Sequence, residues 1–164
     1  MEHRQAQFAA FYESARDDCV RAVTASLGSR QAAEEVVAEA FARAWARWPR
    51  VAEHPSPRAW VVRTALNMHV SWWRRWRREV LTPDRYDQPC HDDPQAAMPD
   101  SAMMAALLAL PPRQRQVVAL RVFLDLDSRA TADTLGIAPG TVTAHLARAT
   151  RALRAHLTAV TERE

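Results

Sequence analysis

The chain has 164 residues, and its hydrophobic share of 48% is enough for one domain or for two small ones. Its 22 basic residues are all arginine and outnumber 19 acidic ones, so the net charge of +3 permits binding to nucleic acid without requiring it. The three glycines are too few for a phosphate-binding loop, and the two isolated cysteines argue against a zinc site or a disulfide framework. The histidines are scattered, which argues against catalysis. No apolar run approaches the ~18 residues of a membrane span.

Apolar residues recur at helical spacing in three consecutive segments of the first 80 residues. The first predicted helix ends at Gly28, a suitable C-terminal cap, and the second begins after Ser29, a suitable N-cap. We expect Pro49 to end the second helix, because proline cannot continue a helix beyond its first turn. A loop over 50–57 then precedes a third long helix over about 58–80.

A segment rich in proline and aspartate, 81–101, separates this block from a second helical block. The segment has almost nothing to bury, which indicates a flexible acidic linker. Helices are predicted over 102–110, 113–124 and 128–135, and no strand pattern occurs anywhere. The predicted fold is therefore all-α, with a domain at 1–80, the linker, and a domain at 102–164.

The end of the second block has the pattern of a helix-turn-helix. The predicted helix 128–135 is followed by a turn at Gly136 and by a helix that begins at Pro139, which suits a first helical position. Val142, Leu146 and neighbours at helical spacing form its buried seam. The second helix of such a motif lies in the major groove of DNA. The candidates for DNA contact are Thr141, Thr143, Ala144, His145, Arg148 and Arg151; an ordinary basic helix facing solvent is the alternative.

Aromatic and basic residues gather in the C-terminal half of the third predicted helix. Four arginines within five positions suit phosphate neutralisation, and tryptophan rings can stack on unpaired bases for ~1–3 kcal/mol each. Trp73 and Trp76 share an apolar stripe and fit the core better, which leaves Trp72 as the exposed ring. Asparagine is unfavourable inside a helix, so we expect a local interaction to stabilise the Asn67 side-chain amide, for example a hydrogen bond to the 50–57 loop. The candidates here are Asn67, His69, Ser71, Trp72, Arg74, Arg75, Arg77 and Arg78.

The second predicted helix carries charged residues along one face. Glu35, Glu39 and Arg43 follow one another at intervals of four, and Glu39 with Arg43 is the favourable orientation of an i,i+4 ion pair. The pattern alone fits a solvent-exposed face as well as a face that binds a protein.

Both blocks resemble the extracytoplasmic-function (ECF) sigma factors of bacteria. The segment 33–45 (Ala-Glu-Glu-Val-Val-Ala-Glu-Ala-Phe-Ala-Arg-Ala-Trp), with Pro57-Arg58-Ala59-Trp60, Arg63, Asn67 and Trp73-Arg74-Arg75, is similar to the family's domain for the −10 promoter element. The segment 107–115, with Leu120-Arg121, Leu135-Gly136 and Gly140-Thr141-Val142, is similar to its domain for the −35 element. The order and the linker length also agree.

The resemblance implies a promoter-specificity subunit that binds core RNA polymerase and has no catalytic residue, cofactor, metal or small-molecule substrate. It implies that Glu35, Glu39, Phe41 and Arg43 lie where the second helix docks on the β′ clamp helices, and that the C-terminal domain meets the β flap. Asn67 then helps to hold a flipped −10 base, the linker enters the RNA-exit channel, and an anti-sigma factor masks these surfaces. Because the N-terminus lacks a signal-peptide core, we expect the protein in the bacterial cytoplasm.

The resemblance also sets a length scale. Two elements some 17 base pairs apart are separated by roughly 58 Å along DNA, at ~3.4 Å per pair. A compact chain of this size has a radius of gyration of only ~15 Å, whereas the linker reaches about 70 Å when extended. Two tethered domains are therefore expected to span the promoter.

Several positions depart from the family pattern. Family members often have Lys or Arg, then Ser, then Arg where this chain has Thr143, Ala144 and His145, and Ala138 cannot cap the recognition helix with its side chain. We therefore expect weak or altered −35 recognition. Two other hypotheses remain: a stand-alone helix-turn-helix regulator that binds duplex DNA as a dimer, and an interaction module with the sigma shape but no promoter activity.

Overall fold

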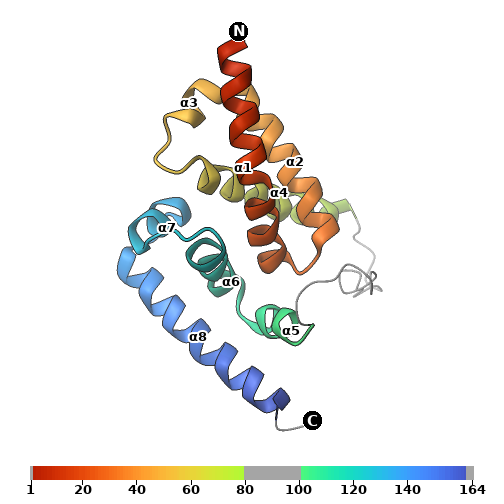
Figure 1. Ribbon diagram of the computed structural model, residues 1–164. Coiled ribbons are helices and arrows are strands. Elements are labelled where there is room, and N and C mark those ends of the chain that lie inside the picture. Colours follow the sequence, from red (N-terminus) through yellow and green to blue (C-terminus); the bar gives the residue numbers. More distant parts are fainter. Residues whose placement is uncertain (1, 80–100, 162–164) are drawn as a thin grey trace.

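The computed structural model describes residues 2–79 and 101–161; of residues 72–79, 101, 160 and 161 it describes only the helical backbone. Its elements, in chain order, are α1 (Glu2–Leu27), α2 (Arg30–Ala46), α3 (Trp48–Ala52), α4 (Pro57–Glu79), α5 (Ser101–Ala109), α6 (Pro112–Val118), η1 (Ala119–Phe123), α7 (Ser128–Leu135) and α8 (Pro139–Thr161). The described part contains helices and no strand, which confirms the all-α prediction (Figure 1). None of these helices is both long and apolar enough to cross a membrane.

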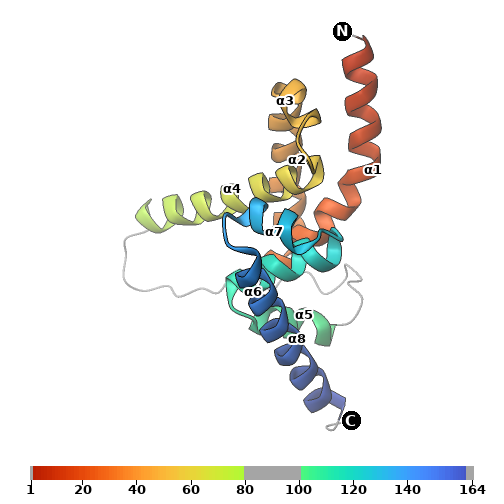
Figure 2. The same cartoon turned by 90° about the vertical axis from the view of Figure 1, so that its left-hand side faces the viewer.

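A tight turn at Gly28 reverses the chain between α1 and α2. Gly28 has a φ of 77°, which favours glycine, and its N–H donates to the carbonyl of Thr24 at 2.8 Å. The Ser29 hydroxyl oxygen then accepts from the N–H of Ala32 at 3.2 Å, as predicted for the N-cap of α2. After this turn α1 and α2 pack side by side, and α4 runs across them (Figure 2).

The predicted end of the second helix at Pro49 is wrong by one turn. The helix α2 stops at Ala46, and Pro49 lies in the first turn of α3, where its missing N–H costs nothing. A continuous helix would bond the Trp45 carbonyl to the N–H of residue 49, which proline lacks. Arg4 supplies the donor instead, through its Nη2 at 2.7 Å from that carbonyl. The predicted loop over 50–57 is therefore shorter, because α3 extends to Ala52.

The predicted helix over 113–124 contains a change of helical type. After α6 the chain forms η1, a single π turn, in which the N–H of Leu124 bonds the carbonyl of Ala119 at 3.3 Å. The Arg121 guanidinium donates to the carbonyl of Leu126 just beyond it. Val117 and Val118 at the end of α6 and Leu120 in η1 lie in three different apolar clusters, so this segment packs against three parts of the core.

The helix-turn-helix forms as predicted. The Asp127 carboxylate accepts from the N–H of Ala130 at 2.7 Å and caps α7, and Gly136 ends it with a φ of 65°. The turn leads into α8, whose Val142 and Ala149 are fully buried, while Leu146 and Leu153 pack against the core. The seam predicted from the sequence is confirmed.

The two halves of the molecule share an apolar core. Ala119, Leu120 and Leu124 belong to the same cluster as the buried side chains of α1, α2 and α4. Contacts also join α1 to α5 and α6, and α4 to α7. The division into domains at 81–101 stays a prediction, because residues 80–100 lie outside the described residues. Within the described part, however, the halves pack against each other.

Candidate nucleic-acid and protein interfaces

The recognition helix α8 presents a polar face along its first half. Thr141, Thr143, Arg148 and Arg151 are exposed, whereas Ala144 and His145 are partly buried. The backbone N–H groups of Thr141 and Val142 bond the carbonyl of Ala138, and the Ala138 side chain supplies no cap. Two exposed arginines and the Thr141 side chain can meet phosphates or base edges, whereas the Thr143 hydroxyl donates to the Pro139 carbonyl at 3.2 Å and can only accept a further bond.

A second polar face lies on α4. Asn67 and Ser71 are exposed, and the Ser71 hydroxyl donates to the Asn67 carbonyl at 3.0 Å. Among the described hydrogen bonds, none joins the Asn67 amide to the loop before α4, so that structural explanation gains no support. His69 is half-buried, and burial lowers its pKa, so the imidazole is neutral near pH 7 and adds no charge. The side chains of Trp72, Arg74, Arg75, Arg77 and Arg78 lie outside the described residues.

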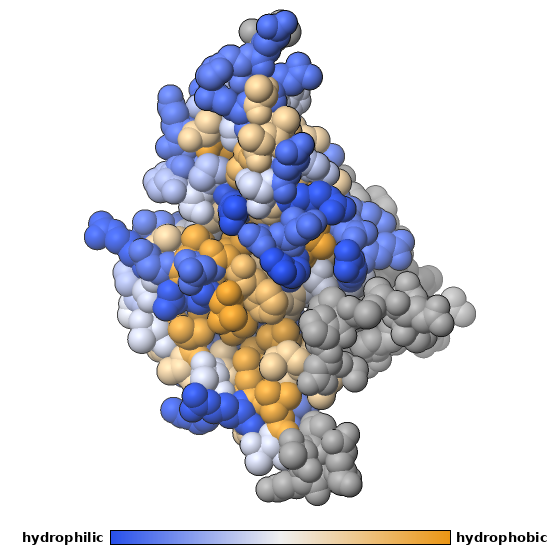
Figure 3. Space-filling model, viewed as in Figure 1, coloured by the Kyte–Doolittle hydropathy of each residue, from blue (hydrophilic) through white to orange (hydrophobic). Residues whose placement is uncertain are grey.

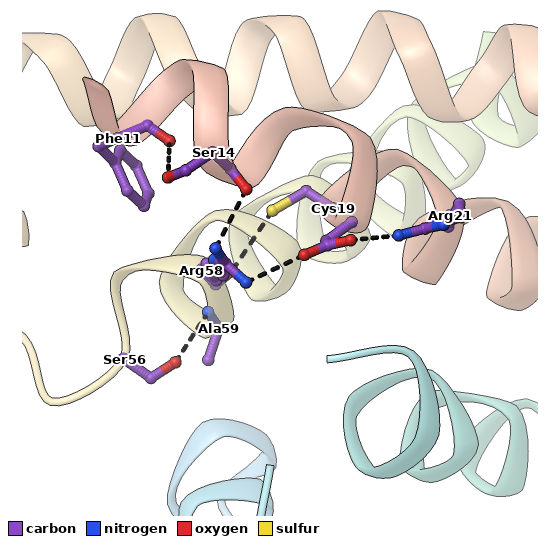
Figure 4. Close-up of polar contacts among 8 residues, drawn as sticks. Phe11, Ser14, Cys19, Arg21, Ser56, Arg58 and Ala59 are labelled. Atoms are coloured by element: carbon purple, nitrogen blue, oxygen red, sulfur yellow. Dashed lines mark hydrogen bonds and ion pairs between the residues drawn. The ribbon is translucent and has the colours of Figure 1, made fainter. Parts of the chain in front are cut away.

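Sequence reasoning missed the residue that fixes the start of α4. Figure 4 shows Arg58 reaching from α4 to α1, where its Nη1 lies 3.0 Å from Asp18 Oδ2 and its Nη2 donates to the Ser14 carbonyl at 3.1 Å. The Ser56 hydroxyl oxygen accepts from the N–H of Ala59 at 3.3 Å and caps the same turn. Arg58 belongs to the Pro57-Arg58-Ala59-Trp60 motif quoted for the family resemblance, so that motif could have identified it. The Arg58 side chain positions α4, the helix that carries Asn67.

The thiol beside this contact is buried. Cys19 donates weakly to the Arg58 carbonyl, with the sulfur 3.9 Å from the oxygen. Burial raises the pKa of Cys19 to about 12, so the thiol stays protonated at neutral pH. It therefore serves as a small core residue rather than a nucleophile.

The charged face of α2 is present as predicted, with one correction. Glu35, Glu39 and Arg43 are exposed, and Arg43 Nε lies 3.0 Å from Glu39 Oε1. Phe41, named with them as a polymerase contact, is only 3% exposed, so its side chain does not form part of this surface. It belongs to an aromatic cluster whose exposed members are Tyr12 and Trp45, each 38% exposed. A helix position between two exposed charges need not itself be exposed.

Apolar side chains gather on the half of the molecule built from α5 to α8. Figure 3 shows them as a band over this half, whereas the α1–α3 end is mostly hydrophilic. A shallow groove on α8 combines apolar Leu146 and Ala147 with Thr143 and Arg151, which also belong to the recognition face. A protein bound in this groove would therefore cover Thr143 and Arg151.

Family models match both halves of the chain. The model described as Sigma-70 region 2 matches residues 11–79, and the model described as Sigma-70, region 4 matches residues 100–153. Together with two polar helix faces on one helical chain, these matches define a sigma-70-type promoter-specificity protein.

Curated relatives narrow this class. An RNA polymerase sigma-E factor of Streptomyces antibioticus is 33% identical over 76% of this chain and 70% of its own length. An ECF RNA polymerase sigma factor SigL of Mycobacterium tuberculosis is 33% identical over 77% and 75%. The sigma-E factor of Streptomyces coelicolor is 29% identical over 93% and 87%. The chain belongs to the ECF RNA polymerase sigma factors.

A solved structure shares the fold of both halves. The sigma factor RpoE from Bartonella quintana, crystallised in complex with the anti-sigma factor NepR, has a TM-score of 0.78 to this chain. The match covers 93% of this chain and 97% of the other, at 21% identity. The likeness therefore extends over both the α1–α4 and the α5–α8 parts.

Proposed function

We propose that this sigma factor docks on core RNA polymerase through α2 and reads a promoter with α4 and α8. The observation that carries the proposal is that two helices with exposed polar faces, one in each sigma-70 region, lie on a single chain. Among the side chains that the structure describes on α4 and α8, none forms the paired groups of a catalytic site, which fits a subunit that leaves nucleotide addition to the polymerase. Like that enzyme, it acts in the cytoplasm.

The α4 face is assigned to the −10 element. Asn67 and Ser71 stand exposed on a helix that continues into a run of arginines, which suits a melted strand with its charged backbone. Arg58 holds the start of this helix against α1, and the helix also packs directly on α2. Docking of α2 on the β′ clamp helices would therefore also place Asn67.

The α8 face is assigned to the −35 element. Arg148 can contact a guanine edge with two hydrogen bonds, and Thr141 and Thr143 can reach phosphates or bases. Few charges precede Arg148 on this face, and Ala138 offers no side-chain cap. We therefore propose that −35 affinity is weak or that the −35 sequence differs from the common one.

Two kinds of protein partner follow from family membership. The apolar groove on α8 suits the β flap of the polymerase or a helix of an anti-sigma factor. The Bartonella relative is a sigma factor bound to an anti-sigma factor, which supports a partner of this kind for the present chain.

In vitro transcription with core polymerase and a promoter library tests the proposal. We expect transcripts that depend on this chain and share two upstream sequence elements. Co-elution with core polymerase in gel filtration provides the direct binding measurement. Binding of a palindromic duplex as a dimer without polymerase would instead favour a stand-alone regulator. Co-elution without transcripts would favour a module that has lost promoter activity.

A further inference from the structure

The break between α2 and α3 lacks the usual helix caps. Arg47 separates the two helices with a φ of −118°, so it is not the left-handed residue that commonly ends a helix. The start of α3 has no side-chain cap, and Pro49 in its first turn has no N–H to offer the Trp45 carbonyl. The sequence around the break therefore supplies little to hold the last turn of α2.

The side chain of Arg4, in the first turn of α1, contacts that last turn of α2 in two ways. Arg4 Nη2 donates to the Trp45 carbonyl at 2.7 Å, and Arg4 Cζ lies 4.7 Å from the centre of the Trp45 ring. A guanidinium over an indole ring is attracted by the π electrons, and a charged donor binds a carbonyl more strongly than a neutral donor does. One side chain thus holds both the backbone and the ring of Trp45.

Phe8, one turn further along α1, contacts both sides of the break. The centre of its ring lies 5.1 Å from that of Trp45, at the end of α2, and 5.1 Å from that of Trp48, at the start of α3. Figures 1 and 2 both show the N-terminal end of α1 at the same end of the molecule as α3. The family model for region 2 begins its match at residue 11. The first turns of α1 therefore add contacts to this break that the matched segment does not contain.

The turn that Arg4 contacts carries one charge of the face assigned to the polymerase. Arg43 lies in the last turn of α2, and its Nε is 3.0 Å from Glu39 Oε1. Both side chains are about half exposed, so water competes for the ion pair and the pair adds little order of its own. The backbone of the last turn, rather than the ion pair, therefore has to fix where the Arg43 guanidinium lies.

We propose that Arg4 is a positioning residue for polymerase docking, which holds the last turn of α2 so that Arg43 keeps its place beside Glu39. The inference rests on the proposed function and adds the first turns of α1 to the parts of the chain on which docking depends. Arg4 acts through Trp45 and the α2 backbone rather than by contact with the polymerase. Without Arg4, the last turn of α2 is ordered in a smaller fraction of molecules, and the affinity for the polymerase falls with that fraction.

Biolayer interferometry of the full chain on immobilised core polymerase tests the proposal with Arg4→Met, Arg4→Lys and a matched control. Methionine removes the charge and the donors, whereas lysine retains both. Arg30→Met makes the same change at the other end of α2, where Arg30 Nε lies 2.9 Å from Glu34 Oε1 in an exposed pair. We expect Arg4→Met to raise the Kd for core polymerase about 3- to 10-fold, in proportion to the lost ordered fraction. Arg4→Lys should recover part of the affinity, and Arg30→Met should leave the Kd unchanged.

Fluorine NMR of the chain containing fluorotryptophan reports on the Trp45 ring itself. The Trp45 signal is the one that Trp45→Phe removes. We expect Arg4→Met to shift this signal, because the ring loses the cation over its face. Arg30→Met should leave the signal in place. A shifted signal with an unchanged Kd would show that Arg4 only packs against the ring, and this result overturns the positioning role.

Equal increases of the Kd for Arg4→Met and Arg30→Met, or for Arg4→Met and Arg4→Lys, also overturn it. Should Arg4→Met fail to fold by circular dichroism, Arg4→Gln asks the same question, since glutamine keeps a donor without the charge. Glu39→Arg in the same assay separates the two proposals. If the unchanged chain does not bind core polymerase, both proposals fail. If Glu39→Arg weakens binding while the Arg4 variants do not, only the positioning role fails.

Discussion

Reversal of the charge at Glu39 should weaken binding to core polymerase without unfolding the protein. Glu39 is exposed and forms an i,i+4 ion pair with Arg43 at 3.0 Å. Loss of such a pair costs ~0.3–0.5 kcal/mol, and two like charges at this spacing cost a similar amount. The total stays below ~1 kcal/mol, whereas domains of this kind unfold with about 5–15 kcal/mol.

At a protein interface the same reversal has a larger effect. A like charge placed opposite a complementary surface costs several kcal/mol, and each ~1.4 kcal/mol is a factor of ten in the dissociation constant. We therefore expect Glu39→Arg to raise the Kd for core polymerase by ~10-fold or more. Biolayer interferometry with immobilised core enzyme measures this value, and urea unfolding of the same sample measures stability.

The helix supplies its own control in Glu34→Arg. Glu34 forms an i,i+4 pair with Arg30 at 2.9 Å, so its reversal has a similar local cost. It lies five residues before Glu39 and therefore about 140° around the helix. We expect polymerase affinity to change little. Equal losses of affinity for the two variants would refute the assignment of the Glu35–Glu39–Arg43 face, and an unchanged Kd for Glu39→Arg would remove Glu39 from the interface.

Three further predictions concern the −10 surface, the −35 surface and the buried thiol. Asn67→Ala should reduce promoter melting, followed by permanganate reactivity, more than initial promoter binding; equal loss of both contradicts the assigned role. Arg148→Ala should weaken binding to −35 duplex by about 1–3 kcal/mol, measured by fluorescence anisotropy, whereas Arg154→Ala, further along α8, should have a smaller effect. Because burial raises the pKa of Cys19 to about 12, the thiol ionises first in the unfolded chain, and the unfolding free energy should fall above about pH 9 by up to ~1.4 kcal/mol per pH unit. Cys19→Ala should remove that part of the slope in urea titrations between about pH 8 and pH 10; an unaltered slope would show that other groups cause it.

Elements with local signals were predictable from the sequence. Gly28 and Ser29 act as caps and Gly136 forms the turn, as expected from the sequence, because caps and turns depend on a few adjacent backbone groups. The family and the helix-turn-helix were also predicted correctly. The end of α2 was missed by one turn, and the Trp45 carbonyl near that end accepts from Arg4, a residue 41 positions away that no local pattern links to it.

Features that depend on packing between distant segments were not predictable. Phe41 was named as a polymerase contact from the family resemblance, yet aromatic rings from α1 cover it. The contact of Arg58 with Asp18 joins residues 40 positions apart, and no helical periodicity encodes it. The packing of η1 on α1 likewise depends on a shape match between two halves, which residue patterns within each half do not describe.

The π turn at Ala119–Phe123 affects how the chain tolerates changes in length. A π turn holds one residue more than an α turn over the same stretch, so it takes up a single inserted residue without rotating the helix on either side. Val122, which is 62% exposed, is the residue there whose removal would cost the least buried surface. Relatives with an ordinary α-helix at this place are expected to align with a one-residue gap near Val122. Gaps inside α7 or α8 would instead rotate the recognition helix and should be rare.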